Sequence, residues 1–176
     1  MLEPSRLGFK SSIGDFSEGL TLSSSEIKEE SRKYNMTRTK ISHVEYEAKR
    51  ATLVLENNKK HQMIITFFVS NNDGAFKYTL LRQENNNPKT AIILNEVSSF
   101  KFPEGTTTFI SPQSDAMIGF ERSKPSYEEV YSADADMNKK SQYGHGYVFP
   151  ALFHIGNHGW LLLVKLELLL DIVLLI

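Results

Sequence analysis

The residues best suited to chemistry in this sequence are two tyrosines and two glutamates that fall within five positions. They are Tyr127, Glu128, Glu129 and Tyr131. Aromatic rings stack on flat apolar faces such as those of sugars, and carboxylates accept hydrogen bonds from hydroxyl groups. We therefore expect an exposed loop that lines a sugar site or seals an interface between domains. A plain loop with a half-buried tyrosine pair is the alternative.

These glutamates are not assigned a catalytic role. Glycoside hydrolysis needs two carboxyl groups on opposite sides of the scissile bond at a set separation. Glu128 and Glu129 are neighbours in sequence and cannot be given those two roles. No catalytic residue is predicted in this chain.

An acidic segment resembles the start of a calcium-binding loop. Asp134, Asp136 and Asn138 have the spacing of the first three EF-hand ligands. Lys139 stands where that loop needs glycine, and His145 stands where it needs a bidentate acid. We therefore expect a solvated acidic loop and no metal.

Three histidines are the other candidates for metal binding. His145, His154 and His158 are close in sequence, but no further ligand has metal spacing. We expect His154 to point away from the face that carries Phe153 on a strand, and His158 to lie in a turn. No metal site is predicted.

Composition is that of a globular domain. The chain has 176 residues, 40% hydrophobic and 23% charged, with a net charge of -1 and no cysteine. The charge balance argues against a nucleic-acid partner, and the lack of cysteine removes disulfides and thiolate metal sites. The opening MLEPSRLGF has no signal-peptide pattern, and the domain is expected to be incomplete at its N-terminus.

Short apolar segments separated by turn residues predict an all-β fold, a β-sandwich. The best-defined element is a hairpin over residues 61–81 with Asn71 to Gly74 at its turn. Ser23 to Lys33 is expected to be an exposed loop or a marginal turn of helix, and residues 111–146 a long polar stretch with little strand character. The other predicted strands are 51–56, 90–94, 98–102, 107–110, 147–153 and 160–163.

Four segments in order carry a family resemblance: LEPSRLGF (2–9), FFVSNNDGAFKY (67–78), YEEVY (127–131) and GYVFPALFHIGNHGWLL (146–162). Together they resemble the N-terminal domain of glycoside hydrolase family 97, which contains α-glucosidases and α-galactosidases. The resemblance implies a β-super-sandwich of the galactose-mutarotase type, followed in the intact enzyme by a (β/α)8 barrel. It also implies Bacteroidota-type bacteria as the source and the periplasm as the compartment of an intact member.

The resemblance places the catalytic carboxylates and most ligands of a calcium ion on the barrel, outside this chain. One further calcium ligand, a glutamate, is expected just after the strand that contains Trp160. Here the sequence instead runs LLLVKLELLLDIVLLI from Leu161. Deleting one base from a back-translated family-like stretch that reads LLVSETG regenerates this tail, so we interpret it as a frameshift product. No cofactor is therefore expected in this chain.

The expected organisation is a sandwich domain over residues 1–164 and an apolar tail over residues 165–176. Trp160 to Ile176 is apolar, but Lys165, Glu167 and Asp171 would be costly in a bilayer, so no membrane span is predicted.

The function expected is that of a carbohydrate-binding accessory domain beside the barrel of an α-glycosidase, without activity of its own. The alternatives are a stand-alone β-sandwich for protein interaction or structure, or a non-functional fragment.

Overall fold

The computed structural model describes residues 2–81, 91–114, 129–165 and 171–175. In these ranges the chain forms antiparallel strands and one 3-10 turn, with no α-helix. The all-β prediction is thereby confirmed. The described residues fall into two compact units, one spanning mainly residues 4–100 and the other mainly residues 101–168 and 172–176. Each is described by itself.

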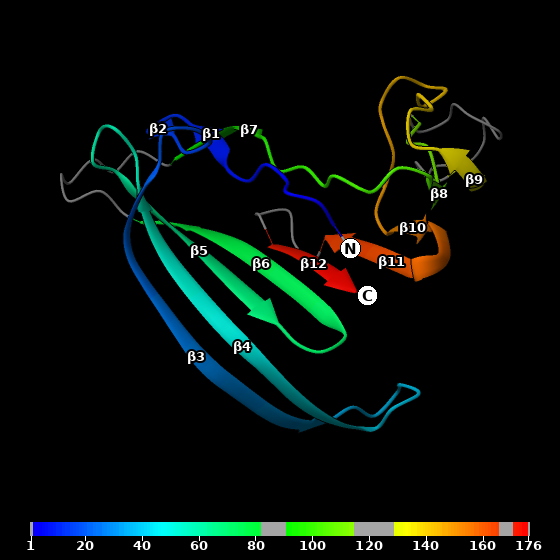
Figure 1. Ribbon diagram of the computed structural model, residues 1–176, viewed down its shortest axis with the longest axis horizontal. Coiled ribbons are helices and arrows are strands. Elements are labelled where there is room, and N and C mark those ends of the chain that lie inside the picture. The colour runs from blue at the N-terminus through cyan, green and yellow to red at the C-terminus, as the bar shows by residue number, and fades with distance from the viewer. Residues whose placement is uncertain (1, 82–90, 115–128, 166–170, 176) are drawn as a thin grey trace. The chain divides into compact units, whose positions relative to one another are not determined.

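The unit of residues 4–100 contains a four-stranded antiparallel meander (Figure 1). Its strands are β3 (Thr21–Asn35), β4 (His43–Glu56), β5 (Gln62–Val69) and β6 (Asp73–Leu80). The β5–β6 hairpin confirms the prediction for residues 61–81. It forms where apolar residues alternate on both sides of a turn that Asn and Asp tolerate.

Three short strands form a second sheet in the same unit. They are β1 (Phe9–Ser11), β2 (Gly14–Asp15) and β7 (Ile93–Glu96), in the order β2-β1-β7. Residues after β7 continue the pairing, since the amides of Val97 and Ser99 donate to the carbonyls of Gly8 and Arg6.

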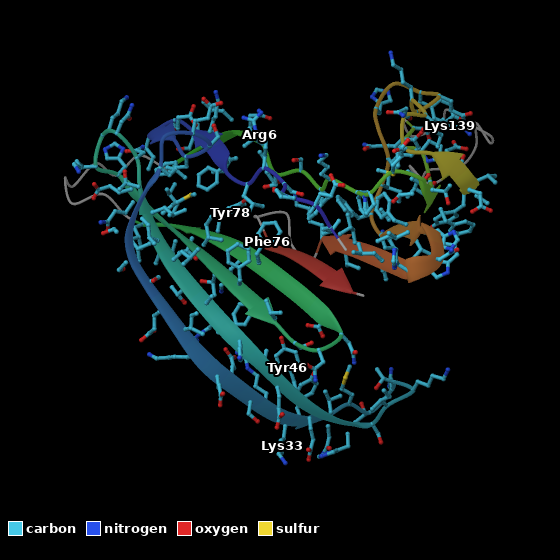
Figure 2. The ribbon with its side chains drawn as sticks, viewed as in Figure 1. Arg6, Lys33, Tyr46, Phe76, Tyr78 and Lys139 are labelled. Carbon is cyan, nitrogen blue, oxygen red and sulfur yellow. The ribbon has the colours of Figure 1, made fainter. Side chains whose placement is uncertain are left out.

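The apolar core of this unit lies between the two sheets. Phe9 contacts the rings of Phe16 and Tyr78, with centroids 5.3 and 5.4 Å away. Phe76 packs against Tyr78 edge to face at 5.6 Å. Figure 2 shows Phe76 and Tyr78 on the side of β6 that faces β1. Two sheets that bury aromatic rings between them form a sandwich, as predicted.

The other unit contains a five-stranded antiparallel sheet in the order β9-β8-β10-β11-β12. The strands are β8 (Thr106–Ile110), β9 (Ser132–Asp136), β10 (Ala151–Ile155), β11 (Trp160–Lys165) and β12 (Asp171–Leu175). The 3-10 turn η1 (Gly156–His158) connects β10 to β11. One face is buried, and it carries Ala151, Phe153, Ile155, Leu161 and Leu163.

The prediction for Ser23 to Lys33 was wrong. This stretch lies within β3, which pairs with β4 along nearly its whole length. β3 is almost entirely exposed, so it has no apolar face for a sequence pattern to reveal. Its strand conformation depends on β4, which supplies the backbone pairing and cross-strand ion pairs, such as Lys33 Nζ to Glu45 Oε1 at 2.8 Å.

Three other predicted strands are displaced or absent. The strand predicted at 90–94 is observed as β7, three residues later at its start. Residues 98–102 form no regular strand; they contribute the Ser99 amide bond to Arg6 and an isolated bridge between Lys101 and Glu3. The strand predicted at 147–153 begins at Ala151, and β9 lies within the polar stretch where little strand character was expected.

Candidate functional site

The predicted segment 127–131 is only partly described. Tyr127 and Glu128 lie outside the described residues. Glu129 is 7% exposed, whereas Val130 and Tyr131 are exposed. The expectation of an exposed loop therefore does not hold for Glu129, and it holds for Tyr131.

Two buried serines hold Glu129 in place. The Ser111 hydroxyl donates to the Glu129 carbonyl at 2.7 Å and accepts from the Glu129 amide at 3.1 Å. The Ser114 hydroxyl donates to Glu129 Oε1 at 3.0 Å. Because buried polar groups need such partners, these bonds fix the chain just before β9 against the segment that follows β8. The Glu129 carboxylate serves this junction and faces away from solvent.

Tyr131 stacks on Phe109 of β8. Their ring centroids are 5.1 Å apart and the planes differ by 11°. Both side chains remain exposed to solvent. This pair is a flat, accessible aromatic surface.

A second ring pair, of an exposed tryptophan and a half-buried histidine, lies in the same unit and was missed as a site by sequence reasoning. His154 of β10 and Trp160 of β11 are directly paired, and their rings stack with centroids 4.4 Å apart. His154 does point away from the face of the buried Phe153, and His158 lies in the 3-10 turn, as predicted. Trp160 was missed because every residue from Trp160 to Val164 is apolar, so alternation along β11 cannot tell its two faces apart.

Within the described ranges, no three His, Asp or Glu side chains converge to hold a metal ion. Asp134 and Asp136 lie in β9, not in a loop that wraps around an ion. The described residues of β11 after Trp160 are Leu, Leu, Leu, Val and Lys165. None of these five side chains is a carboxylate.

The structure contains no helix in the described ranges that is long and apolar enough to cross a membrane. The described parts of the apolar stretch from Trp160 onward form two strands, β11 (Trp160–Lys165) and β12 (Asp171–Leu175).

Comparison with known proteins gives one family and several related structures. The family model "Glycosyl-hydrolase 97 N-terminal" matches residues 1–165. A crystal structure of a beta-arabinopyranosidase is 44% identical, with a TM-score of 0.84, over 99% of this chain and 30% of its own. A glycoside hydrolase family 97 enzyme from Pseudoalteromonas sp. strain K8, in complex with acarbose, is 13% identical with a TM-score of 0.69, over 97% of this chain and 26% of its own. No curated protein matches the sequence.

This chain therefore spans less than a third of the length of those structures. The match to the family model covers nearly all of it and includes every strand from β1 to β11. The chain belongs to the family of N-terminal domains of glycoside hydrolase family 97.

Proposed function

We propose that this chain is the carbohydrate-binding accessory domain of an α-glycosidase whose catalytic barrel lies outside it. The observation that carries the proposal is the family match over residues 1–165, joined to a 44% identical glycosidase of which the chain spans 30%. The exposed Tyr131–Phe109 stack supports a direct role in holding sugar. In the whole enzyme, the Tyr127–Tyr131 segment would line the substrate pocket or the interface with the barrel.

The sugar class is proposed from the related structures. One related structure is a beta-arabinopyranosidase, and a more distantly related glycoside hydrolase family 97 enzyme was solved in complex with panose. Each of these sugars offers pyranose rings that an aromatic side chain can cover. We therefore expect the domain to bind pyranosides and to discriminate against acyclic polyols.

Catalysis and calcium binding are assigned to the barrel. The one described glutamate of the candidate segment, Glu129, is held by Ser114 in the interior and cannot reach a substrate in solvent. General acid and base groups must reach the atoms that they protonate or deprotonate. The domain alone should neither hydrolyse glycosides nor bind calcium with micromolar affinity.

The test is calorimetric titration of the chain with panose, acarbose and methyl β-arabinopyranoside, with mannitol as the acyclic control. Saturable binding of a pyranoside without binding of mannitol supports the proposal. Absence of binding to all three would refute the carbohydrate-binding role. Turnover of aryl glycosides by the pure chain, well above background, would refute the assignment of catalysis to the barrel.

A protein-interaction module is a second candidate, because β3 lies at the edge of its sheet and fourteen of its fifteen residues are exposed. An open edge can pair with a strand of another chain. The charges on β3, among them Lys28, Glu29 and Lys33, oppose such pairing, since charged side chains blunt edges. Concentration-dependent self-association without sugar binding would favour this second candidate.

A further inference from the structure

One face of the sheet in the 101–168 unit carries a row of side chains suited to a sugar. Trp160 pairs with His154, His154 with Thr107, and Thr107 with Asp136. Residues directly opposite on neighbouring strands project from the same face. An indole, an imidazole, a hydroxyl and a carboxylate therefore follow one another across β11, β10, β8 and β9.

The core of this unit lies on the other face. Phe153, Leu161 and Leu163 point there and are buried, while Trp160 remains 50% exposed. Burying a large apolar side chain stabilises a fold. The fold forgoes much of this gain at Trp160, and His154 holds the indole flat by stacking on it.

The neighbouring row provides a second aromatic surface. Leu162 pairs with Leu152, and Leu152 pairs with Phe109, on which Tyr131 stacks. Phe109 lies two strands and two residues from Trp160, a separation of about 12 Å from standard sheet dimensions. Two ring stacks, each with at least one exposed aromatic ring, thus share one face, with shorter side chains between them.

Polar groups beside the rings indicate the class of ligand. The Thr107 hydroxyl donates to Asp134 Oδ1 at 3.3 Å, and Asp134 and Asp136 are exposed. A protein partner would favour an apolar surface with charges kept to its rim. Rings interleaved with a hydroxyl and carboxylates instead match a ligand with a flat apolar face and an edge of hydroxyl groups.

We infer that this face is an oligosaccharide-binding surface, on which one pyranose ring stacks on Trp160. The Tyr131–Phe109 stack holds a second ring of the same chain, and the hydroxyl edge of that second ring donates to Asp134 or Asp136. This inference rests on the proposed carbohydrate-binding function and names its site.

The sequence offers a direct reporter, because Trp160 is the single tryptophan of the chain. Panose and methyl β-arabinopyranoside are titrated into the 176-residue chain while indole emission and acrylamide quenching are recorded. Stacking on Trp160 should shift the emission saturably and protect it from the quencher. Binding is measured in parallel by calorimetry, which does not depend on the tryptophan.

Three variants make the test specific. Trp160→Ala should weaken binding by about tenfold or more, the scale of one lost aromatic stack. Trp160→Phe keeps a ring and should bind within a few-fold of the unmodified chain. Tyr34→Ala removes an exposed tyrosine of β3, in the 4–100 unit, and should change nothing. Circular dichroism of each variant confirms that the strands remain.

The outcomes separate the two proposals. Sugar binding that survives Trp160→Ala, with no change in indole emission in the unmodified chain, would overturn this site and leave the proposed function standing. Absence of sugar binding to the unmodified chain would overturn both. Binding that falls with Trp160→Ala and is kept in Trp160→Phe and Tyr34→Ala would support both.

Discussion

Removing the hydroxyl of Tyr78 should loosen the two sheets of the 4–100 unit from each other. The hydroxyl accepts a 2.7 Å hydrogen bond from the Gly8 amide, just before β1, and lies 2.8 Å from Ser98 Oγ, just after β7. Tyr78 itself is in β6, and it is buried. The Tyr78 hydroxyl oxygen therefore links β6 of the larger sheet to the segments that adjoin β1 and β7 of the small sheet.

Tyr78→Phe keeps the ring and its edge-to-face contacts with Phe9 and Phe76. It leaves the buried Gly8 amide without its acceptor, and a buried donor without a partner costs about 1–3 kcal/mol. We expect a loss of about 2 kcal/mol in the free energy of unfolding, roughly 30-fold in the unfolding constant. Ser98→Ala, which leaves the Gly8 bond in place, should cost only about 0.5–1.5 kcal/mol.

Urea denaturation gives these differences, and hydrogen exchange at the Gly8 amide reports the contact itself. Tyr78→Phe should speed that exchange, while Ser98→Ala should leave it nearly unchanged. If Tyr78→Phe unfolds at the same urea concentration as the unmodified chain and Gly8 stays protected, the hydroxyl does not join the sheets.

A pH series adds an independent check on Tyr78. Burial raises the pKa of Tyr78 above its ordinary value of 10.0. In the unfolded chain the phenol therefore loses its proton at lower pH than in the folded one, so stability falls as pH rises through and above 10. Tyr78→Phe has no such phenol, and the gap between the two proteins should narrow in that range.

Three further predictions concern other parts of the chain. Gly8→Ala should lower the free energy of unfolding, measured by urea denaturation, by about 3 kcal/mol or more. The reason is that Gly8 has φ +124° and an added Cβ would lie 2.3 Å from the Phe16 carbonyl oxygen. Gly105→Ala, at φ +78° in open space, should lower it by only about 1–2 kcal/mol. Hydrogen bonds from Ser17 lower the pKa of Asp15 to about 2. The stability that this carboxylate contributes is therefore present above pH 3.8 and is lost as pH falls toward 2. Asp15→Asn should make the loss of stability between pH 3.8 and 2 smaller, and an unchanged loss would contradict this role of Asp15. Residues 165–176 are rich in Leu, Ile and Val and contain no Pro or Gly, a composition that promotes aggregation when exposed. Deleting them should raise the soluble yield, but only partly, because the edge of β11 that β12 pairs with is then uncovered. An unchanged or lower yield would contradict this reasoning.

Local signals made some elements predictable. The 61–81 hairpin has apolar strands on both sides of Asn71 to Gly74, so its turn and its faces are encoded within twenty residues. The ring direction of His154 was predictable for the same reason, because Ala151, Phe153 and Ile155 alternate with it. In both cases the pattern and the structure use the same period of two.

Other features depend on residues distant in sequence. β3 is a strand because β4 pairs with it across a turn, although its own residues are polar and exposed. Glu129 is buried because Ser111 and Ser114, 18 and 15 residues away, satisfy its backbone and its carboxylate. A polar segment reads as solvated unless such partners are known, which is why the sequence favoured an exposed loop there.

The apolar tail is another place where pairing with a neighbouring strand, and not a local sequence pattern, determines the structure. Ile172 to Leu175 pair with Lys165 to Leu162 of β11 through backbone groups, which every residue except proline can supply. β11 pairs with β10 along one edge and with β12 along the other. Leu, Ile and Val favour extended backbone, so the composition of β12 suits this pairing. The family match ends at residue 165, the last residue of β11, so β12 lies outside it, whereas the beta-arabinopyranosidase structure aligns with 99% of this chain.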